Sequence, residues 1–376
     1  MKKLSTWEAA CIITGYGIGS GVMSMPYLAQ RIGIINASVI LLLAFAASCV
    51  LHLMIAELSL KTEDGGQIIS CLNRFLFKGK YKKYLSASFF ILMLLVLLTN
   101  LTGYITASAE IITGFLGMPE IVSMFIFYAA ACIVVLFGLK AVGVSEKYCI
   151  FAIYLLLGVL GYFSLKKKFN PLPLLNIDVK GILAYYGMAM FSLSAFFSVP
   201  QAARGLGGDR KEIRKAIFIG FLNNLIMIAV INVCSLLVSP EVTEVAMTGW
   251  SAGLGVWAQI VGGLFTILAM LSTYWSLSLA LSDTVREALS VGKKQAWVIA
   301  TFPSLVIAIV NPYGFLGLMR TAGGLVSIII AVMIVPAFMN ARKTEGVSML
   351  DNNGNAVCAA VIIAYILMGV GSAVPL

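Results

Sequence analysis

Long apolar segments follow one another along almost the whole chain of 376 residues. Hydrophobic residues make up 60% of the sequence and charged residues only 11%, whereas soluble domains carry about 25% charged residues. A water-soluble fold of this size could not bury so much apolar surface, so the surroundings that the sequence predicts are lipid. A helix needs roughly 20 mainly apolar residues to cross a bilayer. The sequence therefore predicts an all-α integral membrane protein.

Eleven apolar segments meet this requirement, and the loops between them alternate in charge. If the N-terminus lies inside, most of the 26 Lys and Arg residues fall in inner loops, as the positive-inside rule requires, and the C-terminus lies outside. The segment 61–83 combines apolar residues at helical spacing with a run of lysines, so it is either an amphipathic helix on the inner membrane surface or a plain basic loop. The predicted spans are 7–31, 34–60, 84–114, 120–139, 147–165, 181–204, 213–239, 255–285, 295–311, 314–340 and 355–374.

Composition argues against several classes of protein. The net charge of +10 has its simplest cause in the inner loops, so nucleic acid is not a predicted partner. The seven cysteines are scattered, and a single histidine, His52, makes a metal or haem centre a poor hypothesis. We expect His52, in mid-span, to be a packed neutral residue rather than a proton relay. No nucleotide-binding loop or nucleophile elbow is present, so the sequence predicts neither an enzyme nor a cofactor.

A short pattern occurs twice and indicates an internal repeat. Residues 20–29 and 194–203 both read S-x-x-x-S-x-P-x-x-A. Five predicted spans separate the two copies, and because that number is odd, the two halves must have opposite topology. Inverted repeats of this kind are typical of secondary transporters. The predicted organisation is a single transmembrane transporter domain over 1–376, with repeat one at 7–165, repeat two at 181–340 and an extra helix at 355–374.

Both copies of the pattern lie in helices that should break. The first span holds Gly15, Gly17, Gly19 and Gly21, followed by Pro26, and glycine and proline cost about 1 and 3 kcal/mol in a helix interior. An unwound segment in lipid is tolerated only where it lines a polar cavity. The alternative is close helix packing through small residues.

The sixth span has no glycine at the corresponding place. It offers the hydroxyls of Ser192, Ser194 and Ser198, and Pro200 frees a backbone carbonyl one turn upstream. Together with the repeat, these features favour a polar cavity between the two helices over close packing.

Four stretches of the chain resemble the amino acid/auxin permease family of the amino acid–polyamine–organocation superfamily, and its bacterial aromatic and neutral amino acid permease branch in particular. The resemblance implies a leucine-transporter-like fold, in which a 5+5 inverted repeat carries an eleventh helix. The stretches are Thr14–Pro26, Phe191–Pro200, Gly207–Gly220 and Leu271–Asp283.

The resemblance also implies a substrate site between the two broken helices. Its first-helix residues would hold the carboxylate of an amino acid, its sixth-helix residues would meet the amino group and side chain, and residues of the third and eighth helices would face them. The sequence departs from aromatic permeases at Phe196, where those proteins often carry histidine, and at Ser194, where they often carry glycine. The implied substrate residues are Ile18, Gly19, Ser20, Gly21, Asn100, Tyr104, Phe191, Ser192, Ser194, Phe196 and Tyr274.

A coupling cation is implied next to this site. Ser272 and Thr273 match the position where sodium-coupled members of the fold bind sodium, against first-helix carbonyls near Gly15 and Ile18. Some proton-coupled relatives place a fifth-helix lysine there, whereas here Lys147 lies at the inner end of that helix, which favours sodium over a proton. The alternative is that Ser272 and Thr273 bond to carbonyls of their own helix.

Charged residues near the outer ends of the spans are candidates for a gate. Glu110 is expected to pair with an arginine, either Arg31 or Arg320, although these side chains could instead snorkel to the surface. Pro26 and Pro200, beside the two breaks, complete the predicted gating residues.

The sequence thus predicts a multi-pass transporter of the plasma (inner) membrane, with its N-terminus in the cytoplasm. Its expected function is ion-coupled import of neutral or aromatic amino acids by alternating access, with an amino acid, a coupling cation and lipid as partners. The alternatives that remain open are a non-transporting amino acid sensor and a permease for another small solute. An ion channel is less well supported, because no repeated filter loop is present.

Overall fold

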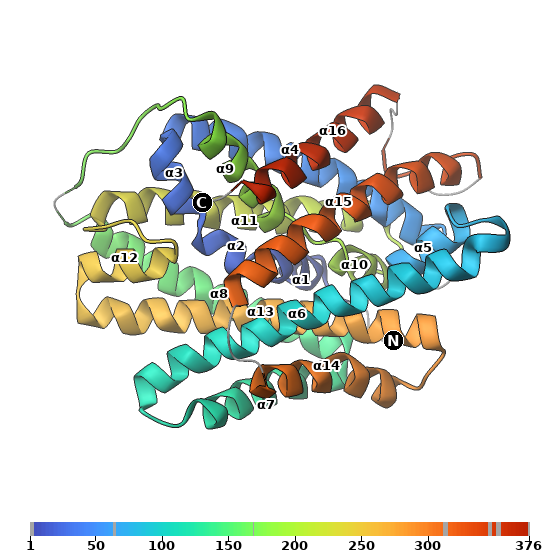
Figure 1. Ribbon diagram of the computed structural model, residues 1–376, viewed down its shortest axis with the longest axis horizontal. Helices are drawn as coiled ribbons and strands as arrows, with labels where there is room; N and C mark the ends of the chain where they lie inside the picture. Colours follow the sequence, from blue (N-terminus) through green and yellow to red (C-terminus); the bar gives the residue numbers. More distant parts are fainter. Residues whose placement is uncertain are drawn as a thin grey trace.

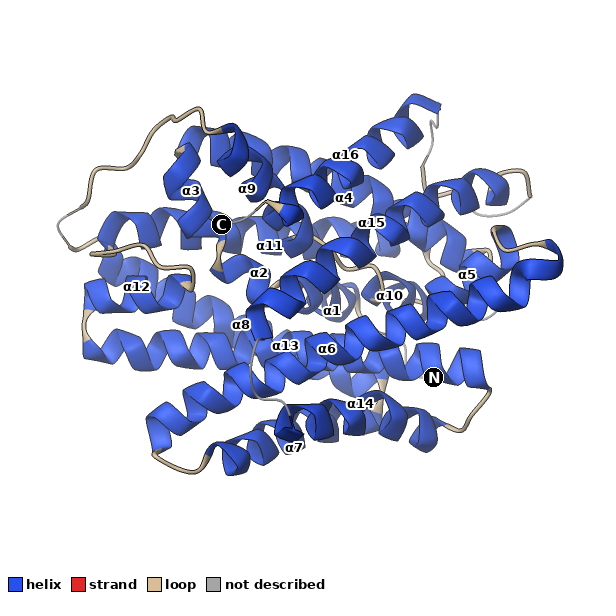
Figure 2. Ribbon diagram, in the orientation of Figure 1, coloured by secondary structure: helices blue, strands red, loops and turns tan. Residues whose placement is uncertain are grey.

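The computed structural model describes residues 4–62, 65–167, 169–310, 315–344, 348–350 and 355–374, and within them the side chains of all but Ser20 and residues 315–327. Helices and their connections account for this part of the chain, and it contains no strand (Figure 2). The predicted all-α class is therefore confirmed. The helices are α1 (Thr6–Gly17), α2 (Ser20–Met23), α3 (Met25–Ile32), α4 (Ile34–Leu60), α5 (Ile68–Phe75), a 3-10 turn (Gly79–Tyr81), α6 (Lys82–Leu116), α7 (Glu120–Phe137), α8 (Leu139–Ser164), α9 (Val179–Ser192), α10 (Ser198–Gly205), α11 (Arg210–Val238), α12 (Ala246–Leu254), α13 (Val256–Leu289), α14 (Lys293–Val310), α15 (Phe315–Ala341) and α16 (Asn355–Ala373).

Eight of the described helices are long and apolar enough to cross a membrane unaided. They are α4, α6, α7, α8, α11, α13, α14 and α16, which correspond to eight of the eleven predicted spans. The other three spans differ from these for separate reasons. The span at 7–31 is divided into α1, α2 and α3, and the span at 181–204 is divided into α9 and α10. The span at 314–340 is α15, whose side chains are described only from residue 328.

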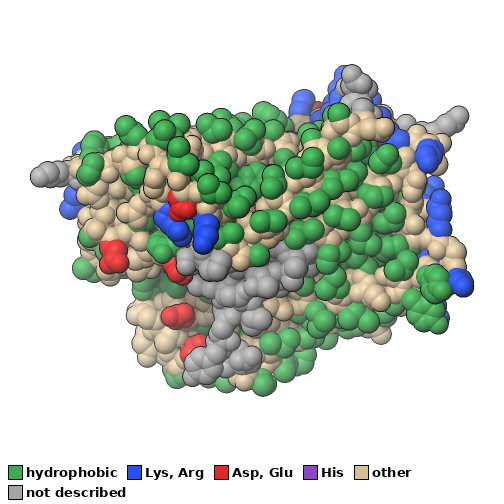
Figure 3. All heavy atoms as spheres, turned by 45° about the horizontal axis from the view of Figure 1, so that its top comes forward, with side chains coloured by type: hydrophobic (Ala, Val, Ile, Leu, Met, Phe, Trp, Pro, Cys, Tyr) green, Lys and Arg blue, Asp and Glu red, His purple; other side chains and the backbone are tan. Residues whose placement is uncertain are grey.

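The divided helices meet near the middle of the bundle, where α1, α2 and α10 lie, while α3 and α9 lie toward its upper left in the view of Figure 1. Helix α1 packs against α8, α11 and α13, while α2 and α3 pack against α9. The outer surface is covered with apolar side chains, and Lys and Arg gather toward its ends (Figure 3). Large hydrophobic residues such as Leu43 on α4 and Phe151 on α8 are more than half exposed. This distribution is the inverse of that in a soluble protein and suits contact with lipid.

The segment 61–83 contains a short amphipathic helix, α5, rather than only a basic loop, and its apolar side packs on other helices. Within it, α5 buries Ile68, Leu72 and Phe75 against α4, α6, α13 and α15. The backbone N–H of Gln67 and the hydroxyl of Ser70 both donate to the carboxylate of Glu287 on α13. The apolar side of α5 therefore faces other helices. Helical periodicity in a sequence shows that a helix has an apolar side, but not whether that side contacts protein or lipid.

The last helix, α16, is fixed to α9 by a close backbone contact. A Cβ added to Gly187 of α9 would lie 2.7 Å from the backbone nitrogen of Ser372, and one added to Gly371 would lie 3.0 Å from the nitrogen of Gly187. The hydroxyl of Tyr186 also donates to the carbonyl of Ala364 at 3.1 Å. Small residues let the two backbones approach closely, as is usual between membrane helices.

Candidate functional site

The first helix breaks where the glycines occur. Helix α1 ends at Gly17, and α2 begins at Ser20 after Gly19, whose φ of −58° and ψ of −151° are not helical. A Cβ on Gly21 would lie 2.6 Å from the hydroxyl of Ser192 and 2.8 Å from the ring of Phe191. Real Cβ atoms do not come so close, so glycine is what allows the first break to contact the second.

The second break lies directly opposite. Helix α9 ends at Ser192 and α10 begins at Ser198. Between them, the backbone N–H of Ala195 donates to His52 Nε2 at 2.9 Å, while His52 Nδ1 donates to the carbonyl of Ser48 at 2.6 Å. The His52 ring also stacks on Phe196, with centroids 5.1 Å apart. Both ring nitrogens are engaged in one neutral tautomer, which agrees with the predicted packed histidine.

A small cavity of about 50 Å³ lies between the two breaks. It has room for a few water molecules, and its aromatic walls close tightly around it. The sequence prediction missed Tyr16, Phe197 and Leu277, which contribute to those walls. The predicted substrate residues that line the cavity are Gly19, Gly21, Asn100, Tyr104, Phe191, Ser194 and Phe196.

The remaining predicted substrate residues are placed differently. Ser192 is buried beside Gly21, and its hydroxyl has no partner among the described residues. Ile18 is fully buried behind the break, and the side chain of Ser20 lies outside the described residues. The prediction that Tyr274 contacts the substrate is wrong. Its hydroxyl lies 3.2 Å from Ser304 on α14, and its ring packs edge-on against Phe127 on α7. It therefore faces away from the cavity.

Asn224 is a buried polar residue that the sequence analysis did not single out. It lies on α11, it is fully buried, and neither polar atom of its side chain has a partner in the described part of the chain. A Cβ on Gly17 would collide with its Nδ2, so the amide lies directly against the first break. An asparagine pair in the middle of the predicted span 213–239 was the signal that could have found it.

The residues predicted to bind a cation lie together between α1 and α13. The Thr273 hydroxyl contacts the carbonyl of Gly15 at 2.8 Å and that of Ala269, on its own helix, at 2.9 Å. The hydroxyl therefore reaches a first-helix carbonyl of the implied cation site and also, as in the alternative, a carbonyl of its own helix. Ile18 follows at the end of α1, where its backbone N–H donates to the carbonyl of Thr14.

Glu146 also belongs to this cluster, and the sequence analysis missed it. Its carboxylate accepts hydrogen bonds from the Ser272 and Ser276 hydroxyls, the latter at 2.7 Å. The predicted span began at residue 147, which left Glu146 in a loop, whereas α8 begins at Leu139 and buries Glu146 completely. The oxygen-only donors of this cluster suit a hard cation such as sodium.

Glu110 was predicted to pair with Arg31 or Arg320 in an outer gate, and the pair with Arg31 does not form. Arg31 Nη2 pairs with Asp178 Oδ2 at 3.1 Å, and Glu110 is exposed, so Arg31 and Glu110 do not form the expected pair. The side chain of Arg320 lies outside the described residues. Pro26 and Pro200 stand in the first turns of α3 and α10, where a helix tolerates proline because that N–H has no intrahelical partner.

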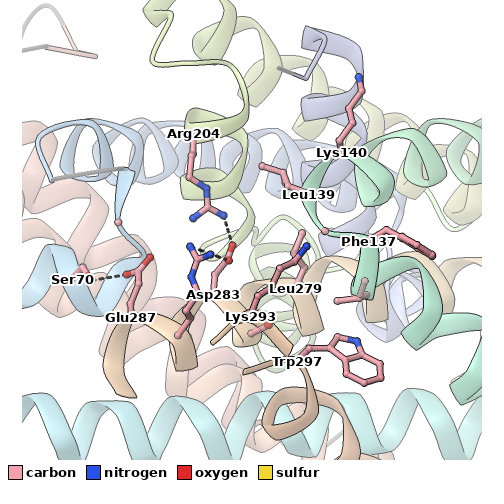
Figure 4. Close-up of a pocket in the computed structure, with 15 residues that line it drawn as sticks. Ser70, Phe137, Leu139, Lys140, Arg204, Leu279, Asp283, Glu287, Lys293 and Trp297 are labelled. Atoms are coloured by element: carbon pink, nitrogen blue, oxygen red, sulfur yellow. Dashed lines mark hydrogen bonds and ion pairs between the residues drawn. The ribbon is translucent and has the colours of Figure 1, made fainter. Parts of the chain in front are cut away.

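A second, larger and more open pocket of about 930 Å³, which we call the vestibule, is shown in Figure 4. The side chains of Arg204 on α10 and Asp283 on α13 point toward one another across it and form an ion pair. Leu279 lines the vestibule and Leu277 lines the small cavity, so both spaces border α13. The charged residues of the vestibule are Lys140, Arg204, Asp283, Arg286, Glu287 and Lys293.

Two solved structures share this arrangement of helices. The transporter MhsT, in complex with L-phenylalanine, superposes with a TM-score of 0.67 at 17% identity, covering 99% of both chains. Mhp1, a nucleobase-cation-symport-1 family transporter in a closed conformation with bromovinylhydantoin bound, gives a TM-score of 0.65 at 12% identity, covering 99% of this chain and 92% of its own. The fold is thus the leucine-transporter-like fold.

The family follows from the sequence. The profile of the tryptophan/tyrosine permease family matches residues 2–372, and the chain belongs to that family. A curated relative, glutamine transporter 2 of Aliivibrio fischeri, is 22% identical over 357 residues, which is 90% of this chain and 89% of the relative. The resemblance to amino acid permeases is therefore confirmed, and the family consists of transporters rather than enzymes.

Proposed function

We propose that this protein imports neutral or aromatic amino acids, driven by sodium and by alternating access around the cavity between its broken helices. The observation that carries the proposal is this cavity, where unwound backbone from two helices meets aromatic side chains in the middle of a membrane bundle. Irregular backbone at this depth is kept where it binds a solute.

The cavity lining supports a neutral substrate. Its apolar walls include Tyr16, Phe191, Phe196 and Phe197, and none of the described residues that line it carries a charge. A charged amino acid side chain would enter such a pocket without a counter-charge, which is costly. The phenylalanine bound to MhsT and the glutamine carried by the curated relative are both neutral amino acids.

The main-chain groups of the substrate would meet the breaks themselves. The first N–H groups of a helix have no intrahelical partner, and those that follow Gly19 suit a carboxylate. The unpartnered Ser192 hydroxyl and Asn224 amide lie against the same breaks and can accept or donate to an amino acid. These groups give the pocket a polar end beside its aromatic walls.

The route toward the cytoplasm is the vestibule. It opens among the basic loops that the positive-inside rule assigns to the cytoplasm, with the N-terminus on that side and the C-terminus outside. In this conformation the vestibule is wide and the central cavity is small, so the substrate site must widen for a substrate to enter or leave.

Uptake into proteoliposomes tests the proposal. We expect phenylalanine, tyrosine, tryptophan, leucine or glutamine to accumulate under an inward sodium gradient, while lysine and glutamate do not. Accumulation of only lysine and glutamate would overturn the proposal of a neutral substrate. Accumulation driven by a proton gradient alone would overturn the proposal of sodium coupling. Stabilisation of the purified protein by an amino acid without any flux would instead identify the sensor alternative, and flux of a different solute would identify another permease.

A further inference from the structure

A fully buried carboxylate lies at the junction of three helices without a cationic partner. Glu146, from α8, lies between α1 and α13 and receives hydrogen bonds from Ser272 and Ser276. No Lys or Arg of the described chain forms an ion pair with it. Lys147, its neighbour in sequence, has its ammonium group 4.8 Å from the centre of the Tyr148 ring, and Lys140 pairs with Glu8.

Hydrogen bonds from two hydroxyl groups do not compensate for the free-energy cost of burying a charged carboxylate inside the bundle. Removing an ion from water costs several kcal/mol even after the protein relaxes, and ionisable residues inside a membrane protein are retained mainly where they have a function. The other ionisable groups close to Glu146 are the thiols of Cys11 on α1 and Cys149 on α8, which are neutral when protonated. The negative charge of Glu146 must therefore be neutralised, either by a proton on the carboxyl group or by a bound cation, and the surrounding atoms distinguish the two.

Oxygen atoms surround this carboxylate on the side of the first break. The Ser276 hydroxyl also reaches the carbonyl of Ile12, at 3.2 Å, and Thr273 reaches the carbonyl of Gly15, at 2.8 Å. A Cβ placed on Gly15 would lie 2.6 Å from Glu146 Oε1, so only glycine leaves space for the carboxylate beside the end of α1. Carbonyl, hydroxyl and carboxylate oxygens are the ligands that hard cations prefer.

We propose that Glu146 is the charged ligand of the sodium site that Ser272, Thr273 and the carbonyl of Gly15 complete. A hydroxyl group has two lone pairs besides its proton, so the Ser272 hydroxyl can coordinate sodium while it still donates its proton to the Glu146 carboxylate. The negative charge of Glu146 then neutralises the cation inside the bundle. The inference deepens the proposed sodium coupling and rests on it, since it names the residue that supplies the charge.

Sodium binding to the purified full-length protein tests this assignment without any amino acid. Binding of radioactive sodium is measured at equilibrium, and thermal unfolding is measured in sodium chloride and in choline chloride at equal ionic strength. The variants are Glu146→Gln, which keeps the shape but removes the charge, and Glu146→Asp, which keeps the charge. Glu120→Gln, on the exposed first turn of α7, is the matched control.

We expect sodium to bind the wild type and Glu120→Gln equally and to raise their unfolding temperatures, because a ligand of the native state stabilises it. Glu146→Gln should lose about tenfold or more in sodium affinity, and Glu146→Asp should retain part of it. Equal sodium affinity in Glu146→Gln and the wild type would overturn the assignment. So would a wild type that shows no sodium binding.

Counterflow of labelled amino acid at equal sodium on both sides separates this proposal from the proposed function. A wild type that exchanges amino acid but does not bind sodium keeps the transporter and overturns the role of Glu146. If Glu146→Gln does not fold, two measurements still decide the question. One compares the sodium affinities of the wild type and Glu146→Asp, and the other compares the unfolding temperatures of the wild type in sodium chloride and choline chloride.

Discussion

Gly17 and Gly21 allow two broken helices to touch where larger residues would hold them apart. A Cβ on Gly17 would lie 2.6 Å from the carbonyl of Ser192, and a Cβ on Gly21 would lie equally close to the Ser192 hydroxyl. These contacts explain why the polar ends of both breaks converge on one small cavity. The sequence could indicate such glycines by their number, but not which side chains they would touch.

The substitution Gly21→Ala should therefore damage the substrate site. The added methyl group meets Ser192 and the Phe191 ring, and an overpacked site costs about 1–3 kcal/mol, which corresponds to roughly tenfold or more in affinity. Amino acid uptake at low substrate concentration measures the loss. Gly158→Ala on α8, where a Cβ has nothing within 4 Å, is the matched control. Equal uptake by the two variants would contradict the placement of Gly21.

His52 holds the second break by accepting the N–H of Ala195. The substitution His52→Ala leaves that N–H unpaired and opens a cavity beside Phe196, so we expect the protein to lose about 2 kcal/mol or more of stability. The thermal midpoint of the purified protein measures this loss. Ser38→Ala, on the exposed side of the same helix, should have little effect. A His52→Ala protein as stable as Ser38→Ala would show that the break does not depend on this contact.

At the scale of helices and loops, the predictions that succeeded depended on long patterns. Apolar runs of full membrane length located α4 and α11 correctly, because their lengths far exceed the uncertainty of their ends. Predictions that depended on a helix boundary failed. Glu146 was assigned to a loop because α8 begins eight residues before the predicted span.

Arg31 and Asp178 connect the end of α3 to the start of α9, outside the apolar spans. The hydrogen bond from the backbone N–H of Gly181, together with the nearby Arg31 guanidinium, holds the pKa of the Asp178 carboxyl below its usual range. Since this pKa is depressed in the folded protein, the carboxylate contributes stability above its ordinary pKa of about 3.9, and that contribution is lost as the pH falls through the lower folded value.

The wild type should therefore be more stable than Asp178→Asn by a constant margin from pH 8 to pH 5. The margin should shrink as the pH falls below about 4. Thermal unfolding of both proteins across this range measures it, and Glu120→Gln serves as a control without an ion pair. A margin that grows as the pH falls would contradict the assigned sign.

For the whole molecule, composition and loop charge predicted a multi-pass helical membrane protein, and the family and fold agree. The geometry between distant segments could not be predicted, because it depends on which helices touch. The direction of the Tyr274 side chain and the ion-pair partner of Arg31 are examples. Each depends on a contact with a residue more than 25 positions away in the sequence. The unpaired amide of Asn224 became informative only once its position beside Gly17 was known.

The orientation of the whole bundle gives one more prediction. If the vestibule with its basic loops faces the cytoplasm, an epitope at the N-terminus should be cut by trypsin in inside-out vesicles and protected in right-side-out ones. An epitope at the C-terminus should behave in the opposite way, which makes each fusion the control for the other. Protection of both ends in the same vesicles would contradict an odd number of spans.

The close contact between Gly187 and Gly371 has a mechanical consequence. The proposed alternating access requires α9 to move when the central cavity widens, and the close backbone contact should then carry α16 with it. The opposite face of α16 exposes Ile363, Ile366 and Val370, and the hydrocarbon chains packed on that face must rearrange with it. Part of the work of each transport cycle is therefore done on the bilayer, and the thickness and fluidity of the surrounding lipid enter the turnover rate.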